Sequence, residues 1–140
     1  MTVRVERAVT VPATPEEVWA FIADPGKRAE PISVVQDFEV RDDGSAVWHL
    51  SLPIPLLDRT VAVETEDTVR DPPHRVEFEG RSSVMHVRGE HELEAVDGST
   101  RLANRFAVDG RVPGVERFFR NRMDDELDNL ESALARELGV

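Results

Sequence analysis

The spacing of apolar residues along the chain changes twice, and each change marks a different kind of element. Residues 2–11 alternate between apolar and polar positions, which predicts a β-strand with one buried face. Residues 32–109 keep this period of two over most of their length. In residues 113–138 the apolar side chains stand three or four positions apart, which predicts an amphipathic helix. The chain therefore begins with a strand, continues through a strand-rich region and closes with a long helix.

A short helix follows the first strand. Thr14 is followed by Pro15 at the first helical position and by Glu17 at the third, which is the pattern of a capping box. Asp24-Pro25-Gly26 ends this helix, because the residue before a proline avoids the helical conformation. We expect one further helical turn at residues 27–30.

Turn signals divide the middle of the chain into six strands. Asp43-Gly44 and Asp97-Gly98 each predict a two-residue type I′ turn, and Pro72-Pro73 separates another pair of strands. The expected strands cover residues 32–41, 45–52, 59–70, 74–81, 84–96 and 100–109. In the strand 84–96 one row is mostly apolar and the other is charged, as in an antiparallel sheet with one buried face. The inward row of that strand contains Met85, Val87, His91, Leu93 and Ala95.

The last helix carries a continuous apolar stripe, and Gly139 follows it as a C-terminal cap would. The stripe consists of Val115, Phe119, Met123, Leu127, Leu130, Leu134 and Leu138. One helix is about 10 Å wide, so it cannot cover seven strands spaced about 4.8 Å apart. We therefore expect a single α+β domain over residues 1–140. In it a curved seven-stranded antiparallel sheet, two short helices and the long C-terminal helix enclose a hydrophobic cavity.

Charge excludes several classes of partner. The chain has 28 acidic and 17 basic residues and a net charge of −11, whereas nucleic acids and anionic membranes require an excess of Lys and Arg. Lys27 is the only lysine among the 17 basic residues. An acidic surface with so little lysine resembles proteins of salt-accumulating halophiles, and a GC-rich genome is the alternative explanation for the arginines.

The chain contains no cysteine, which excludes disulfides, zinc–thiolate sites and iron–sulfur clusters and fits a reducing compartment. Its longest apolar runs are a few residues, far short of the roughly 20 that cross a bilayer. No signal-peptide pattern is visible at the N-terminus. We therefore expect a cytoplasmic protein without stable membrane insertion.

The order of elements, the stretches VPATPEEVWAFIADP and DPPHRVEFEG, and the closing amphipathic helix together resemble the START-like, or Bet v 1-like (SRPBCC), superfamily. The resemblance covers essentially the whole chain. Within the superfamily the chain is most similar to the polyketide cyclase/dehydrase and lipid-transport group, which includes coenzyme Q-binding proteins and proteins like the G component of carbon monoxide dehydrogenase. The resemblance implies a helix-grip fold with a cavity between sheet and C-terminal helix. It also implies one of two activities. The protein would either bind a lipid, quinone, hormone or polyketide, or catalyse a cyclisation. Glu30 departs from the family, which often has an aromatic residue there, and the plant-type glycine-rich loop is missing.

The histidines do not form a metal-binding pattern. They are His49, His74, His86 and His91. His86 and His91 lie five residues apart on one strand, so their side chains point to opposite faces. Metal-binding HExxH, serine-hydrolase GxSxG and phosphate-binding loop motifs are absent from the sequence. We expect neither a metal site nor a cofactor.

Polar residues in the inward rows are candidates for orienting a ligand. They are Gln36, Thr65, His91 and Asn104. Each is either a buried group satisfied by its neighbours or a pocket-lining group. Among these residue types, only histidine has an unperturbed pKa that suits acid–base work near neutral pH. His91 is therefore the candidate base if a reaction occurs.

The entrance to the cavity is predicted from the parity of connections in an up-and-down sheet. The loop 53–58, the loop 80–83 and the start of the last helix lie at one end of that sheet. The first loop is apolar, and the helix start carries Arg111, Arg117, Arg120 and Arg122, with Phe118 predicted to be exposed beside Arg122. We expect an apolar lid and a cationic rim that suit an amphiphile with an acidic or phosphate head. Ion pairing, packing on the helix and a dimer contact are the alternatives.

From these observations we expect a protein that binds or transports a small hydrophobic or amphiphilic ligand, such as a lipid, isoprenoid, quinone or polyketide-like molecule. The expected ligand-binding residues are Trp48, Val63, Phe78, Met85, His91, Asn104, Phe106, Phe119, Arg122 and Met123. The alternatives are a cyclase/dehydratase that uses His91 and an accessory module that docks another protein. We expect a monomer or weak homodimer.

Overall fold

The computed structural model describes residues 2–54 and 60–140. Its elements, over these residues, are β1 (Thr2–Val11), α1 (Pro15–Ile22), α2 (Pro25–Ala29), β2 (Val35–Val40), β3 (Ala46–Leu50), β4 (Val61–Asp71), β5 (Arg75–Arg81), β6 (Met85–Val96), β7 (Ser99–Gly110) and α3 (Val115–Leu138). The predicted order of elements is confirmed. Most boundaries lie within two residues of the prediction.

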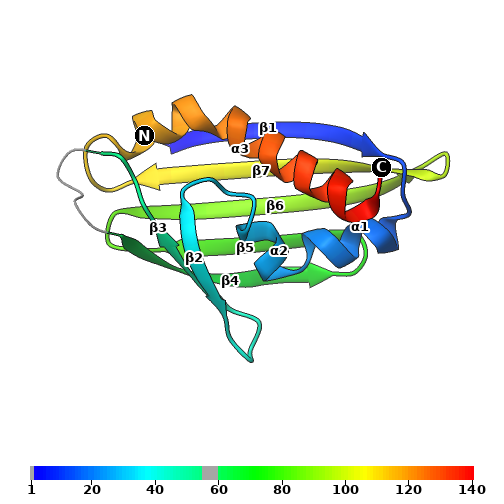
Figure 1. Cartoon of the computed structure of the whole chain (residues 1–140), viewed down its shortest axis with the longest axis horizontal. Coiled ribbons are helices and arrows are strands. Elements are labelled where there is room, and N and C mark those ends of the chain that lie inside the picture. The colour runs from blue at the N-terminus through cyan, green and yellow to red at the C-terminus, as the bar shows by residue number, and fades with distance from the viewer. Residues whose placement is uncertain (1, 55–59) are drawn as a thin grey trace.

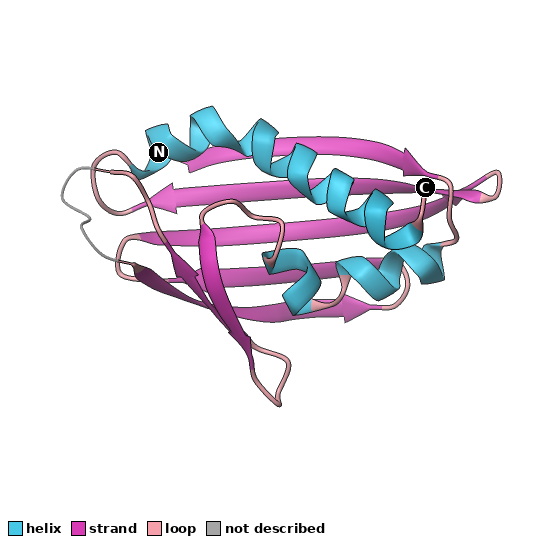
Figure 2. Ribbon diagram, in the orientation of Figure 1, coloured by secondary structure: helices cyan, strands magenta, loops and turns pink. Residues whose placement is uncertain are grey.

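The seven described strands form one antiparallel sheet in the order β1-β7-β6-β5-β4-β3-β2. From β2 to β7 each strand pairs with the next strand in sequence, and β1 pairs with β7. Figure 1 shows how the sheet curves, so that β2 and β3 cross in front of the longer strands. Helix α3 runs diagonally over the same concave face, and α1 and α2 lie beside its C-terminal end (Figure 2). The predicted α+β helix-grip architecture is thus confirmed.

Capping side chains determine where the two short helices begin. The Thr14 hydroxyl accepts a hydrogen bond from the Glu17 N–H at 3.2 Å, and the Glu17 carboxylate accepts one from the Thr14 N–H at 3.2 Å. The predicted capping box is therefore confirmed. Asp24 accepts hydrogen bonds from the N–H groups of Gly26 and Lys27. This cap starts α2 at Pro25, two residues before the predicted helical turn.

The two Asp-Gly turns differ from each other. At Asp97-Gly98 both residues have positive φ, 47° and 82°, as a type I′ turn requires. At the other turn Gly44 has a φ of 87°, whereas Asp43 is not in the left-handed region. There the Gly44 N–H donates to the Arg41 carbonyl at 3.0 Å, which makes a type I turn followed by a left-handed glycine. The type I′ prediction is wrong at Asp43-Gly44.

Two residues predicted in inward rows are exposed. Gln36 is exposed because turns at residues 29–35 delay the start of β2 and a register shift follows between Val35 and Asp37. A one-residue shift of this kind moves side chains to the opposite face. Ala95 is exposed because the end of the β6–β7 hairpin extends beyond α3 (Figure 1).

The buried side chains form two clusters along α3. One lies between the first half of α3 and the concave sheet face and includes Trp48, Phe78 and Met85. The other joins the C-terminal half of α3 to α1, β6 and β7 through residues such as Val18 and Leu134. No helix in the described part of the chain combines the length and apolar character needed to cross a membrane.

Candidate functional site

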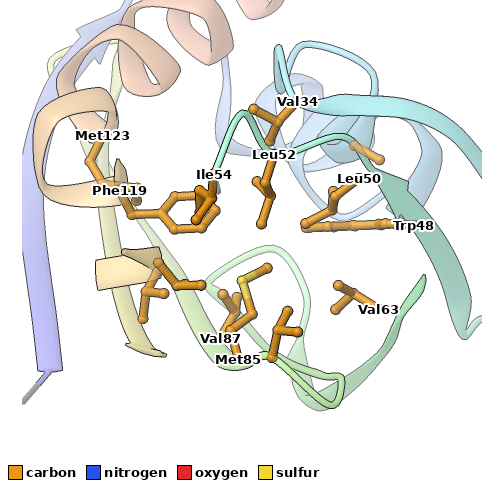
Figure 3. Close-up of a cluster of buried hydrophobic side chains, with 14 of the residues drawn as sticks. Val34, Trp48, Leu50, Leu52, Ile54, Val63, Met85, Val87, Phe119 and Met123 are labelled. Carbon is orange, nitrogen blue, oxygen red and sulfur yellow. The ribbon is translucent and has the colours of Figure 1, made fainter. Parts of the chain in front are cut away.

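A cavity of about 70 Å³ lies between the concave face of the sheet and α3. Figure 3 shows side chains from β3, β6 and α3 converging on this region. Most of the lining is apolar. The lining residues are Arg28, Ile32, Val34, Trp48, Leu50, Phe78, Met85, Val87, His91, Phe106, Val108, Phe119, Met123, Glu126, Leu127 and Leu130.

Seven of the ten residues predicted to bind a ligand line this cavity. They are Trp48, Phe78, Met85, His91, Phe106, Phe119 and Met123. The other three lie elsewhere. Val63 and Asn104 are fully buried outside the lining, and Arg122 is half-buried beside Phe118 and Ser33.

Phe78 lies at the centre of the aromatic part of the cavity. Its ring centroid is 5.8 Å from that of Trp48, 6.1 Å from that of His91 and 6.3 Å from that of Phe106. Gly89 is the residue directly opposite Phe78 on β6. A Cβ at Gly89 would be 2.1 Å from Cε1 of Phe78, so the ring occupies the space that any larger residue would need. The glycine therefore determines where the ring lies.

His91 reaches the cavity from β6 and is held by its neighbour on β7. Its Nδ1 is 2.7 Å from Oδ1 of Asn104, the residue opposite it in the strand pair. Because Oδ1 accepts, His91 donates from Nδ1 and Nε2 keeps its lone pair. Burial lowers the pKa of His91 to about 4, against the opposing effect of the Asn104 hydrogen bond, and the Arg28 charge lowers it further. The imidazole is therefore neutral near pH 7.

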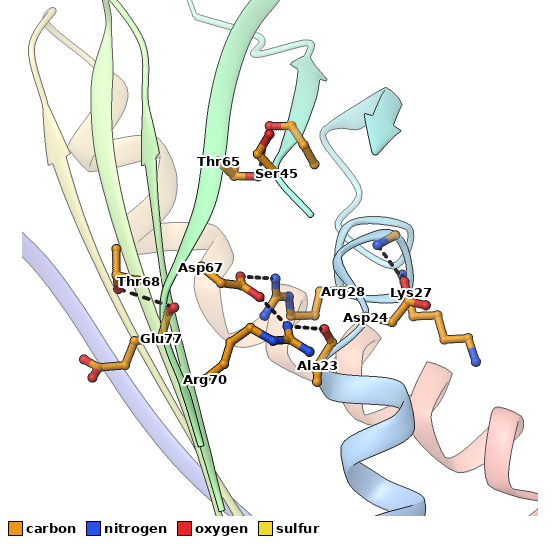
Figure 4. A network of polar contacts seen from close by, with 12 residues as sticks. Ala23, Asp24, Lys27, Arg28, Ser45, Thr65, Asp67, Thr68, Arg70 and Glu77 are labelled. Atoms are coloured by element: carbon orange, nitrogen blue, oxygen red, sulfur yellow. Dashed lines mark hydrogen bonds and ion pairs between the residues drawn. The ribbon is translucent and has the colours of Figure 1, made fainter. Parts of the chain in front are cut away.

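The sequence interpretation missed a buried ion pair at the cavity. Arg28 of α2 donates from Nη2 to Asp67 of β4 at 2.6 Å, and only 6% and 9% of the two side chains are exposed. Asp67 also accepts from Nη1 of Arg70 at 2.6 Å (Figure 4). The Arg28 guanidinium lies 5.0 Å from the ring centroid of Phe78. Burial lowers the pKa of Arg28, and the adjacent Asp67 carboxylate opposes this effect.

The sequence contains a signal for one member of this pair. Asp67 continues the inward row of Val63 and Thr65 on β4, so alternation alone places a carboxylate on the buried face. Such a group needs a cation or several donors. Nothing in the sequence pattern points to Arg28 as that cation, because α2 is too short to show a period.

Glu126 was also missed, although helical geometry places it next to the apolar stripe. It lies on α3 between Met123 and Leu130 and is buried. Its carboxylate accepts hydrogen bonds from the N–H and the hydroxyl of Ser33, and the N–H bond is 2.8 Å long. Arg122 donates to the same hydroxyl at 2.9 Å. This cluster joins the segment before β2 to α3 along one side of the cavity.

Contacts between described residues bring the three predicted entrance segments to one end of the sheet. The Arg111 N–H donates to the Val84 carbonyl at 2.8 Å, and Ile54 lies against Gly114. Residues 55–58 of the predicted lid lie outside the described residues, and Ile54 is buried. Arg111, Arg117 and Arg120 are exposed. Phe118 was predicted to be exposed but is half-buried, because it packs edge-on against Phe119 with ring centroids 5.1 Å apart.

The described residues contain no group of three His, Asp or Glu side chains close enough to hold a metal ion. The titratable groups at the cavity are His91, Arg28 and Glu126, and each has a hydrogen-bond partner in the protein. The arrangement suits binding of an apolar molecule with a small number of polar contacts.

Comparison with known proteins identifies one family. The family model described as polyketide cyclase/dehydrase and lipid transport matches residues 2–135. Comparison with curated proteins gives no match.

Solved structures show the same fold. A conserved protein from Geobacillus kaustophilus is 19% identical, with a TM-score of 0.76 over 98% of this chain and 95% of that one. An aromatase/cyclase from a Streptomyces species is 19% identical, with a TM-score of 0.70 over 97% and 96%. A START superfamily protein from Mycobacterium smegmatis is 13% identical, with a TM-score of 0.69 over 94% and 93%. These likenesses agree with the observed architecture.

Proposed function

Since the chain belongs to the polyketide cyclase/dehydrase and lipid transport family, we propose that it binds a small hydrophobic or amphiphilic ligand in the cavity beneath α3. The observation that carries this proposal is the cavity itself, an apolar space in the interior of a short chain. Protein interiors are normally packed with few voids larger than a water molecule. A water needs roughly 10–15 Å³ of accessible space, so about 70 Å³ exceeds a packing defect.

The size of the cavity limits the ligand. Sites for drug-sized molecules measure roughly 300–1,000 Å³, several times more than here. The ligand is therefore compact, with a single ring or a short branched chain in the cavity. Met85 and Met123 line the space, and their flexible side chains can adapt to ligands of somewhat different shape.

A second function, a cyclase or dehydratase reaction on such a ligand, is favoured by one observation. His91 lines the cavity and is oriented by Asn104, as a catalytic histidine would be. Its pKa of about 4 makes it a poor proton acceptor near pH 7 in the free protein. We therefore favour binding over catalysis.

We also propose that the protein acts in the cytoplasm of a salt-accumulating cell, which its acidic and cysteine-free composition supports.

Native mass spectrometry together with a fluorescence binding assay tests the proposed function. The protein is purified from its own host and analysed for a co-purifying small molecule. Uptake of an environment-sensitive fluorescent probe is then measured in two variants, each with one substitution in the same row of side chains on β6. Val87→Phe fills the cavity and should abolish uptake, whereas Ala95→Phe adds the same ring at an exposed position of the same row and should not.

Thermal unfolding of both variants checks that they fold. Equal uptake by Val87→Phe and Ala95→Phe, with both proteins folded, would show that the probe binds outside the cavity. An absence of uptake in the unsubstituted protein, with no co-purifying molecule, would reject the binding function.

A further inference from the structure

Arg28 is a buried cation that uses only part of its hydrogen-bonding capacity. A guanidinium has five N–H donors, and here Nη2 donates to Asp67 at 2.6 Å. Nε and Nη1 are buried and have no hydrogen-bond partner among the described residues. Buried polar groups are nearly always hydrogen-bonded, because an unpaired one loses its hydration without replacement. Unpaired donors on a buried cation at a cavity wall therefore point to a group that the protein does not itself supply.

A second unpaired donor belongs to another residue of the cavity wall. Nε1 of Trp48 is buried and has no hydrogen-bond partner among the residues that the structure describes. Trp48 and Arg28 come from different elements, β3 and α2, yet both contact the ring of Phe78 and both line the cavity. Two side chains with unpaired donors, from two different elements, thus contact one aromatic ring.

The charges around Arg28 favour an electron-rich partner. Asp67, its ion-pair partner, also binds Arg70, so one carboxylate is shared by two guanidinium groups. The other carboxylate that acts on Arg28 is Asp24, which is exposed and caps α2. His91 stacks with Phe78 and is neutral near pH 7, so it adds no further cation. An oxygen acceptor would satisfy the free donors, whereas a second cation or an N–H donor would not.

We propose that Arg28 and Trp48 form a polar subsite that binds a carbonyl or carboxylate oxygen of an otherwise apolar ligand. The subsite rests on the proposed function, because it assigns the chemistry of the ligand that the cavity holds. It also sets the orientation of that ligand. The oxygen points inward to α2 and β3, and the apolar body points toward Phe119 and Met123 of α3 (Figure 3). This orientation is the reverse of the one predicted from the sequence, in which the polar head of an amphiphile lies at the arginines of the rim.

Titration with three single-ring probes, followed by ¹H–¹⁵N NMR, tests the subsite. Toluene, benzaldehyde and benzoate share one apolar body and differ in the group attached to it. We expect benzaldehyde, benzoate or both to bind about tenfold more tightly than toluene, as one hydrogen bond to a charged donor allows. The indole N–H signal of Trp48 should shift with these oxygen-bearing probes, while that of Trp19 serves as an internal reference. Preference for benzoate identifies a carboxylate ligand, and preference for benzaldehyde identifies a carbonyl ligand.

Two sets of substitutions separate the donors from the rest of the cavity. Trp48→Phe removes one donor and keeps an aromatic ring. Arg28→Met combined with Asp67→Asn removes the ion pair as a unit, so that no buried carboxylate is left unpaired. Each should reduce the affinity for the preferred oxygen-bearing probe, relative to the affinity for toluene in the same variant, about tenfold. Arg117→Met on the exposed rim is the matched control and should change neither affinity.

The outcomes distinguish the subsite from the proposed function. If all three probes bind equally and the substitutions have no effect, the cavity binds apolar molecules and the polar subsite is wrong, with buried water satisfying the donors. If none of the probes binds although a small molecule co-purifies, the subsite is wrong and the binding function stands. If none of the probes binds and no molecule co-purifies, both fail.

Discussion

At the scale of single residues, burial decides what the polar groups of the cavity can do. Arg28 and His91 both line it and both contact the ring of Phe78. Arg28 keeps its charge because a guanidinium stays protonated in proteins, and Asp67 pairs with it at 2.6 Å. His91 is bound by the neutral amide of Asn104, so desolvation outweighs the hydrogen bond and the pKa falls to about 4. Two basic side chains at one cavity therefore have different charges near neutral pH.

The pKa of His91 predicts how stability depends on pH. It is about 4 in the folded protein against an ordinary value of 6.5, so between these values the unfolded state binds the proton more strongly. The contribution of His91 to stability is complete above pH 6.5 and is lost as pH falls toward 4. Between pH 7.5 and 4.5 the loss should be roughly 2–3 kcal/mol. Urea unfolding at both pH values measures it.

The substitution His91→Gln should remove this part of the pH dependence, although it also lowers stability at pH 7.5. His74→Gln, at an exposed position, is the control and should leave the slope unchanged. An identical slope in His91→Gln and the unsubstituted protein would contradict the depressed pKa.

Gly89 provides a second prediction at this scale. Gly89→Ala places a Cβ 2.1 Å from Cε1 of Phe78, so the ring must leave its position. Overpacking of this kind should cost about 1–3 kcal/mol, measured by urea unfolding. In the background of Phe78→Leu the same substitution should cost much less, because no ring occupies the space. Additive effects of the two substitutions would show that they do not share one contact.

At the scale of elements, the two ends of α3 differ in what they contact. The C-terminal half packs its leucines against α1, β6 and β7. The rest of the helix, as far as Leu130, lies over the cavity and contributes residues such as Phe119 and Met123 to its wall. Arg7 of β1 forms ion pairs with the middle of the helix, with Asp128 at 2.9 Å and Glu131 at 3.1 Å. Stability and binding can therefore be changed separately along one helix.

Leu134→Ala tests this division. Leu134 is buried in the cluster with α1 and does not line the cavity, so its truncation should cost about 2–5 kcal/mol of unfolding free energy. Probe binding by the folded variant should stay the same. Asp125→Ala, at an exposed position of the same helix, should change stability by no more than about 0.5 kcal/mol. Equal losses of stability in the two variants would mean that the leucine stripe does not carry the packing.

At the scale of the whole molecule, net charge sets the conditions under which the protein is most stable. A net charge of −11 on 140 residues makes the compact state repel itself. The ion pairs on the outer sheet face, such as Arg105 with Glu6 and Glu90, offset this only locally. Salt screens the remaining repulsion, because the Debye length falls from about 10 Å at 0.1 M to about 3 Å at 1 M.

The melting temperature should therefore rise by several degrees between about 0.1 and 2 M KCl. Scanning calorimetry measures it. A triple variant with Glu30→Gln, Asp42→Asn and Asp125→Asn removes three exposed acids, which changes the net charge from −11 to −8. Its melting temperature should depend less on salt. A melting temperature of the unsubstituted protein that does not change with KCl would contradict the inference of adaptation to high salt.

The sequence by itself determined the architecture and much of the cavity wall. Alternation along β5 and β6 places Phe78, Met85 and His91 on the concave face, and the stripe of α3 adds Phe119 and Met123. These predictions succeed because side-chain direction in a regular strand or helix follows from position alone. They fail at Gln36 and Ala95, where a register shift and an uncovered strand end override the alternation.

Only the tertiary structure decided which polar groups meet and how much space remains. Arg28 and Asp67 are 39 residues apart and belong to a helix and a strand whose relative position no local pattern encodes. The ring of Phe78 lies over Gly89 because the strands pair in one register. The cavity measures about 70 Å³ because the curvature of the sheet and the path of α3 determine the distance between the two layers. Periodicity tells which face a side chain is on, whereas pairing and empty volume depend on how the faces are brought together.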